Sequence, residues 1–245
     1  MTHPADPSAL YDAIEMTWPA AEMRRDGAWM LRDGAGGGKR VSAATADAAV
    51  TPSDLAGLEA GMRALGQLPL VMVRAGQERL DAVLAGAGYA LVDPVNMYAV
   101  AVKTLTVDRP PRLSAFDLWE PLAIQRDIWA AGGIGPARID VMARVAGPKT
   151  ALFGRHDGRA AAAGFVAMHR TVAMVHALEV LAEHRRQGVG RNLTLHAAHW
   201  ASGQGADTLA VLCTRANAGA NALYTSMGFA LVGEYHYRMA KEETP

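Results

Sequence analysis

The chain has 245 residues, of which 51% are hydrophobic and 20% are charged. This length fits one large domain or two small ones, and the composition is that of a folded chain rather than a disordered one. Lysine plus arginine number 24 and aspartate plus glutamate also number 24, which gives a formal net charge of +0. A neutral chain argues against nucleic acid or an anionic membrane as a general partner.

The chain has one cysteine, Cys213, which excludes an internal disulfide framework and a multi-cysteine zinc site. This fits a reducing cytoplasm best. The sequence shows neither a signal-peptide pattern nor an apolar run of the roughly 18 residues that span a bilayer, so we expect a cytoplasmic protein. His196 and His199 lie three apart on an expected helix, but no third ligand accompanies them, and we expect no metal.

The first hundred residues open with a glycine-rich stretch, Gly34–Gly38, between two apolar segments. Its position predicts a hairpin in which residues 29–32 pair with residues 40–43. A helix is expected from Thr51 to about Leu65, because Pro52 suits its first turn and the Asp54 carboxylate suits the positive end of its dipole.

A short series of elements occurs twice, 140 residues apart. In each copy an apolar strand (residues 70–73 or 209–212) precedes a helix (80–87 or 218–227). The helix is followed by a glycine and an aromatic residue, Gly88-Tyr89 or Gly228-Phe229, and then by a second strand. The order predicts two related halves, although glycine after a helix is also a common cap. The paired prolines of Asp108–Arg112 block helix and central strand alike, so we place the boundary there, giving domains 1–107 and 108–245.

The second half begins with two helical patterns, residues 118–131 and 136–145. Three strands in series, 149–156, 160–168 and 172–180, are followed by a strong helix over 191–202. Both halves are therefore expected to be mixed α+β (α/β) folds, each a mixed, mostly antiparallel central sheet flanked by helices.

The turn between the last of these strands and the strong helix reads Arg185-Arg186-Gln187-Gly188-Val189-Gly190-Arg191. Two glycines allow a tight bend, the helix start offers free amide N–H groups, and the arginines add positive charge. A pyrophosphate is a natural ligand for such a turn. The alternative is a well-capped helix with solvated arginines.

Downstream residues favour the ligand. The motif Arg185-x-x-Gly188-x-Gly190, followed by Asn217, Tyr224 and Gly228-Phe229, resembles the GNAT superfamily of acyl-coenzyme-A-dependent N-acetyltransferases. The resemblance covers roughly residues 160–240 and implies that the turn holds the pyrophosphate of acetyl-CoA while strand 172–180 pairs with its pantetheine arm. The implied cofactor-binding residues are Leu178, Val180, Arg185, Arg186, Gln187, Gly188, Val189, Gly190, Arg191, Asn217 and Tyr224. Residues 41–52 of the first half carry no such turn, so we expect a degenerate first domain and one acyl-CoA site.

The resemblance also implies catalytic roles. Tyr224 matches the tyrosine that protonates the leaving thiolate, with packing of its ring as the alternative. Asn217 contacts pantetheine or caps a helix. For the general base we rank Glu179 first and His176 second; strand alternation puts Glu179 on the face opposite Leu178 and Val180, and the sequence leaves open which face meets the cleft.

The expected function is transfer of an acetyl group from acetyl-CoA to a primary amine of a small molecule or peptide, by direct attack in a ternary complex. A CoA-binding module without turnover and an acyltransferase that uses a longer acyl-CoA are the alternatives. The chain is expected to act as a monomer or homodimer, without nucleic acid or membrane.

Overall fold

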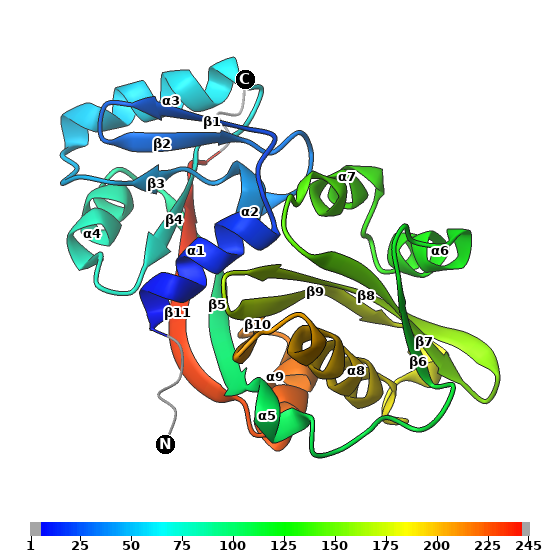
Figure 1. The fold of residues 1–245 in the computed structure, drawn as a ribbon. Helices are drawn as coiled ribbons and strands as arrows, with labels where there is room; N and C mark the ends of the chain where they lie inside the picture. The colour runs from blue at the N-terminus through cyan, green and yellow to red at the C-terminus, as the bar shows by residue number, and fades with distance from the viewer. Residues whose placement is uncertain (1–5, 242–245) are drawn as a thin grey trace. The chain divides into compact units, whose positions relative to one another are not determined.

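The computed structural model describes residues 6–241, and its contacts divide the chain into two compact units (Figure 1). Of the described residues, the larger unit holds 6–19, 97–213 and 217–232, and the smaller unit holds 20–96, 214–216 and 233–241. Strands β5 (Ala90–Ala101) and β11 (Ala230–Met239) contribute residues to both units. The units are discontinuous in sequence, and the domain division at residues 107 and 108 stays a prediction.

The larger unit is a mixed sheet with helices on both faces. Its strands run in the order β5-β10-β9-β8-β7-β6; β6 to β9 pair antiparallel, whereas β10 is parallel to β9. The elements are α1 (Pro7–Thr17), α5 (Val102–Leu105), β6 (Ala115–Leu118), α6 (Ala123–Ala131), α7 (Pro136–Arg144), β7 (Lys149–His156), β8 (Arg159–His169), β9 (Val172–Val180), α8 (Val189–Gly203), β10 (Thr208–Thr214) and α9 (Ala218–Ser226).

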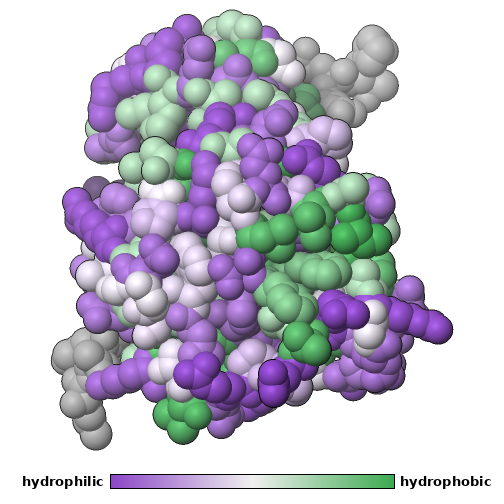
Figure 2. Space-filling view, turned by 45° about the vertical axis from the view of Figure 1, so that its right-hand side comes forward, coloured by the Kyte–Doolittle hydropathy of each residue, from purple (hydrophilic) through white to green (hydrophobic). Residues whose placement is uncertain are grey.

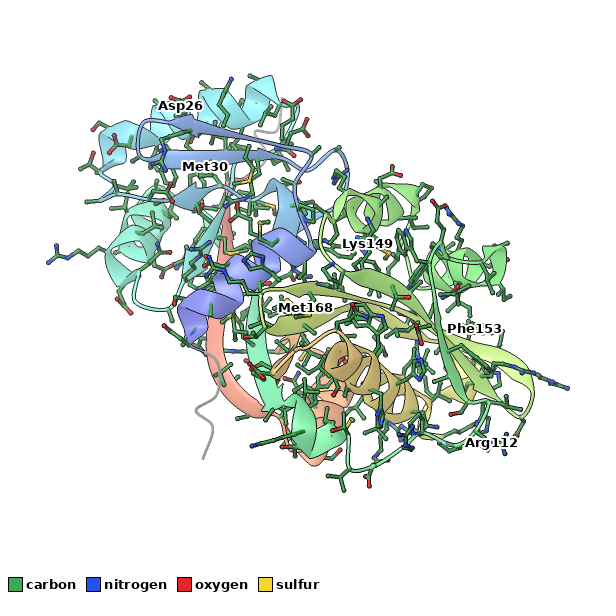
Figure 3. The ribbon with its side chains drawn as sticks, viewed as in Figure 1. Asp26, Met30, Arg112, Lys149, Phe153 and Met168 are labelled. Carbon is green, nitrogen blue, oxygen red and sulfur yellow. The ribbon has the colours of Figure 1, made fainter. Side chains whose placement is uncertain are left out.

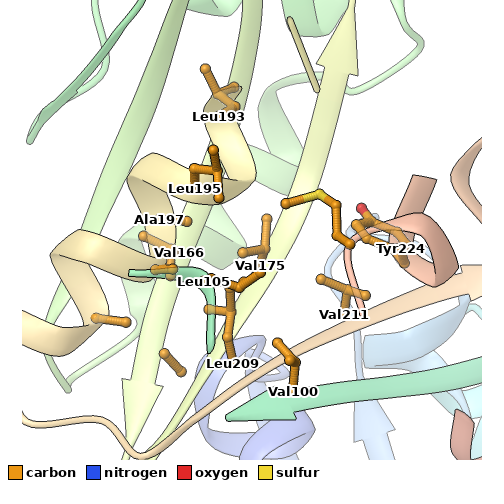
Figure 4. Packing of buried hydrophobic residues seen from close by; sticks show 14 of the residues in the cluster. Val100, Leu105, Val166, Val175, Leu193, Leu195, Ala197, Leu209, Val211 and Tyr224 are labelled. Carbon is orange, nitrogen blue, oxygen red and sulfur yellow. The ribbon is translucent and has the colours of Figure 1, made fainter. Parts of the chain in front are cut away.

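Helix α8 covers one face of this sheet and forms the main core with it (Figure 4). Leu193 and Leu195 of α8 are at most 1% exposed, and they belong to one apolar cluster with Val166, Val175 and Leu209 of the strands. Each such buried aliphatic side chain contributes about 1.5–3 kcal/mol to folding. Helices α1 and α6 pack on the opposite face, where Trp18 contacts Phe165. The two faces of β9 therefore meet different helices.

The smaller unit holds a three-stranded sheet and also β4 (Leu70–Arg74) and part of β11, which stand at one end of the eight-stranded order β4-β11-β5-β10-β9-β8-β7-β6. Strands β1 (Glu22–Asp26) and β2 (Trp29–Asp33) form a hairpin on which Asp26 and Met30 are labelled in Figure 3, and β2 also pairs with β3 (Thr45–Ala46). Strand β4 is antiparallel to β11. The helices are α2 (Lys39–Ser42), the 3-10 turn η1 (Pro52–Asp54), α3 (Leu55–Ala64) and α4 (Glu78–Gly86).

Two expected elements are wrong. Residues 40–43 do not pair with residues 29–32; they lie in and just after the one-turn helix α2, and the hairpin partner of β2 is β1, across a turn at Gly27 with φ of 56°. The helix expected from residue 118 begins only at Ala123, because Pro121 disfavours helical geometry in the residue before it, and residues 115–118 form β6.

The repeated series is present in the structure. Helix α4 spans 78–86 and α9 spans 218–226, an offset of 140 residues at both ends, and each lies between two strands, β4 and β5 or β10 and β11. The mixed α/β fold class is confirmed. Among residues 6–241, no helix is long and apolar enough to cross a membrane.

Candidate active site

A cavity of ≈ 540 Å³ lies in the larger unit, where β9 ends and α8 begins. The pairing of β9 with β10 runs only as far as Val175 and Val211, and Ala177 then adopts a φ of 49°. Every cofactor-binding residue expected from the sequence lines this cavity except Gln187, whose side chain donates to the Glu183 carbonyl at 3.0 Å. The other lining residues are Glu179, His184, Gly219, Ala220 and Leu223.

The turn before α8 has the backbone shape that the glycine spacing predicts. Arg186 and Gly188 have φ of 60° and 77°, and α8 starts at Val189 directly after the left-handed Gly188. A Cβ on Gly190 would lie 3.2 Å from Leu223 Cδ2, so this residue lets α8 and α9 approach closely. The amides of the first turn of α8 have no intrahelical acceptor, and the helix dipole adds positive charge where they meet the cavity.

The three arginines of the turn differ in their surroundings. Arg191 Nη2 lies 2.6 Å from Asp108 Oδ2, and Arg185 Nη2 lies 3.0 Å from Glu179 Oε1. Arg186 is exposed and forms no ion pair within residues 6–241. The positive charge available to an anion is therefore carried mainly by Arg186 and the helix start.

Tyr224 of α9 borders the cavity and is only 6% exposed. Its ring lies 5.4 Å from that of Phe229 and 6.3 Å from that of Tyr98, measured between centroids. Burial raises the pKa of the Tyr224 hydroxyl well above its usual value of 10, with the nearby Cys213 as a further cause. The hydroxyl therefore keeps its proton at neutral pH and is a potential donor; the ring packing and this role coexist.

Behind Tyr224 lies a hydrogen-bond network that the sequence reasoning missed. Asn221 Oδ1 accepts from the Tyr98 hydroxyl at 3.0 Å and from the Cys213 thiol at 3.4 Å, and Asn221 Nδ2 donates to the Asn217 carbonyl at 2.7 Å. Asn217 itself caps α9, because its side chain accepts from Ala220 N at 3.0 Å. The spacing of four between the two asparagines on a helix is the signal that was available.

Glu179 extends from β9 on the face opposite Leu178 and Val180, as the strand alternation predicts. Gly190 of α8 lies close to Leu178 and Val180, whereas Glu179 lies against Gly132 at the end of α6. The side chain of Glu179 is 22% exposed. This carboxylate thus sits between the cavity and the α6 side of the sheet.

His176 is not brought to the cavity. It is 3% exposed, its Nε2 lies 2.9 Å from the Thr17 hydroxyl, and its ring lies 5.0 Å from that of Trp18. His196 and His199 have separate partners, the Asp117 carboxylate and the Asp108 carbonyl, each at 2.8 Å. Residues 6–241 contain no group of three or more histidine, cysteine, aspartate or glutamate side chains placed to hold a metal ion.

Comparison with known proteins agrees with this geometry. Residues 121–229 match the acetyltransferase (GNAT) family. The chain is 27% identical over 238 residues to YobR, an uncharacterized N-acetyltransferase of Bacillus subtilis (strain 168). The aligned region covers 92% of this chain and 95% of YobR.

Two solved structures are similar in fold. A GCN5-related N-acetyltransferase from Kribbella flavida has a TM-score of 0.69 at 21% identity, over 96% of this chain and 94% of its own. A tandem GNAT protein from the clavulanic acid biosynthesis pathway has a TM-score of 0.60 at 13% identity, over 95% of this chain and 87% of its own. The glycine turn, the cavity beside Tyr224 and the family match lead to one conclusion: residues 121–229 form a domain similar to the acetyltransferases of the GNAT family.

Proposed function

We propose that this cytoplasmic enzyme transfers an acetyl group from acetyl-CoA to a primary amine of a small molecule or peptide, by direct attack in a ternary complex. The cavity at the start of α8 carries the proposal, since it unites a left-handed glycine turn, a helix N-terminus, Arg186 and the buried Tyr224 hydroxyl. A pyrophosphate suits the turn, because backbone amides and the helix dipole both favour an anion there.

The residues around the cavity divide the chemistry between them. The backbone groups of Leu178 and Val180 would orient the pantetheine arm. Glu179, directly or through a water, would take a proton from the ammonium form of the acceptor. The free amine then attacks the thioester carbonyl, and the amide C–N bond forms as the C–S bond breaks. Tyr224 gives its proton to the leaving thiolate, and the proton that the new amide nitrogen loses passes through water to the tyrosinate, which restores the hydroxyl.

The acceptor is expected on the α6 side of β9. Exposed apolar side chains of this region are Trp119, Leu122 and Ile124, which are 37%, 45% and 40% exposed, and Lys149 Nζ lies 5.0 Å from the Trp119 ring centroid. Figure 3 labels Lys149 on β7, and Figure 2 shows that hydrophobic residues gather in a patch on one face of the molecule. The exposed apolar side chains of Trp119, Leu122 and Ile124 favour an amine attached to an apolar group.

Calorimetry with acetyl-CoA, followed by a panel of small amines and peptides assayed for release of free CoA, tests the proposal. Saturable binding together with an acceptor whose mass grows by one acetyl group is the expected result. Binding without turnover on any amine would instead indicate a CoA-binding module. A higher kcat/KM with a longer acyl-CoA would identify a different acyl donor.

A further inference from the structure

We infer that Arg185 is a positioning residue for the Glu179 carboxylate, and that Arg186, not Arg185, supplies the main side-chain charge for the pyrophosphate. This inference rests on the proposed function, which it deepens. Its starting point is that Arg185, the first residue of the glycine motif, is already engaged along one edge of its guanidinium group within the protein.

The contacts of Arg185 form a fork. Its Nε donates to the Val180 carbonyl at 3.0 Å, and its Nη2 donates to Glu179 Oε1 at 3.0 Å. Nε and Nη2 share one edge of the planar guanidinium, so a single rigid group joins the end of β9 to the side chain on that strand. Lysine, a point charge on a flexible stem, cannot reproduce this fork.

The second support of Glu179 is Gly132, which ends α6. A Cβ placed on Gly132 would lie 2.6 Å from Glu179 Cγ, Cδ and Oε2, so the carboxylate occupies space that any other residue would fill. Trp129 of the same helix donates from Nε1 to the Ala177 carbonyl at 2.8 Å, which ties α6 to β9 just before Glu179. Glu179 is thus fixed from the turn on one side and from α6 on the other.

The neighbouring Arg186 has the opposite character. It adopts a left-handed φ of 60° directly before the α8 turn, it lines the cavity, and it forms no ion pair within residues 6–241. A cation that is not engaged by the protein loses no internal contact when it binds an anion. The two adjacent arginines therefore have different roles: Arg185 positions the Glu179 base, and Arg186 binds the pyrophosphate of acetyl-CoA.

The test is a double-mutant cycle between Arg185→Ala and Glu179→Gln, with kcat measured at saturating acetyl-CoA and the Kd for acetyl-CoA measured by calorimetry. Arg185→Ala should lower kcat at least tenfold and change the Kd less than threefold. In the Glu179→Gln background it should change kcat less than twofold, because the positioned group is already gone. Arg185→Lys should recover only part of kcat, and Arg186→Ala should weaken acetyl-CoA binding about tenfold.

Two further variants keep the test decisive. If Arg185→Ala fails to fold, Gly132→Ala should reproduce the loss of kcat at unchanged Kd, because its methyl group displaces the carboxylate and leaves both partners in place. Arg159→Ala, an exposed arginine at the start of β8, is the matched control and should change neither quantity.

The possible results distinguish the positioning role of Arg185 from the proposed acetyltransferase function. A tenfold weaker Kd for Arg185→Ala in both backgrounds, or an equal loss of kcat with and without Glu179, would overturn the positioning role while the proposed function stands. Failure of the unaltered protein to bind acetyl-CoA would overturn the proposed function and this inference with it.

Discussion

The Thr17 hydroxyl lies 2.9 Å from Nε2 of His176 and donates its own proton to the Ala13 carbonyl at 2.5 Å. Because the Thr17 hydroxyl proton is donated to the Ala13 carbonyl within α1, the hydroxyl oxygen acts as acceptor toward His176. The Nε2 atom of His176 is therefore the protonated ring nitrogen that donates to Thr17. His176 therefore links α1 to β9. This is a structural role for a residue that the sequence ranked second as general base.

The first prediction separates the two candidates for the base. His176→Ala removes a buried ring and leaves the Thr17 oxygen unsatisfied, so the free energy of unfolding should fall by about 2–4 kcal/mol in urea denaturation. At a temperature where the variant is folded, kcat should change less than threefold, whereas Glu179→Gln should lower kcat at least tenfold. A loss of activity in His176→Ala without loss of stability would return His176 to the catalytic role.

His176 and Glu179 show which features of the larger unit could be predicted from the sequence. The strands 149–156, 159–169 and 172–180 and the glycine turn could be predicted, because local patterning and turn chemistry determine them. The position of His176 could not, since it depends on α1, which lies 159 residues away in the chain at Thr17. The same holds for Gly132, whose closeness to Glu179 arises only when α6 packs on β9.

The second prediction concerns the smaller unit, where Asp81 of α4 accepts from Arg238 Nε and Nη2 at 2.7 and 2.8 Å and lies 2.7 Å from His236 Nε2. The hydrogen bond from Arg238 is the largest cause that lowers the pKa of Asp81 from 3.8 to about 2. A depressed carboxyl pKa adds stability above the unfolded value, and this contribution disappears as the pH falls through the folded value. Asp81→Asn should therefore destabilise the protein by about 2 kcal/mol at pH 7.

Denaturation of both proteins between pH 7 and pH 2 checks this. The difference in unfolding free energy should hold down to about pH 4 and shrink below it, since protonation then gives the unaltered protein the same neutral side chain. Asp140→Asn, at an exposed position of α7, is the control and should change stability by less than about 0.5 kcal/mol. A difference between Asp81→Asn and the unaltered protein that stayed constant to pH 2 would contradict the role of the ionised carboxylate.

The third prediction concerns the one thiol. Burial raises the pKa of Cys213 to about 11, and the side chain is 9% exposed beside Asn221. At pH 8 roughly one thiol in a thousand is ionised at such a pKa, so alkylation by iodoacetamide should be at least 100-fold slower than for free cysteine. Urea should restore the ordinary rate. Rapid alkylation of the folded protein would instead show an accessible thiolate next to Tyr224.

The last prediction uses two glycines at the two ends of α8. Gly188 and Gly205 have φ of 77° and 86°, and a Cβ on either would meet no heavy atom within 4 Å. Alanine at each position should therefore cost a similar 1–2 kcal/mol of unfolding free energy, from backbone strain alone. Gly188 lines the cavity and precedes the amides proposed to hold the pyrophosphate, whereas Gly205 only follows the C-terminal end of the helix. Gly188→Ala should weaken acetyl-CoA binding at least tenfold in calorimetry and Gly205→Ala less than twofold; equal affinities of the two variants would place the pyrophosphate somewhere other than this turn.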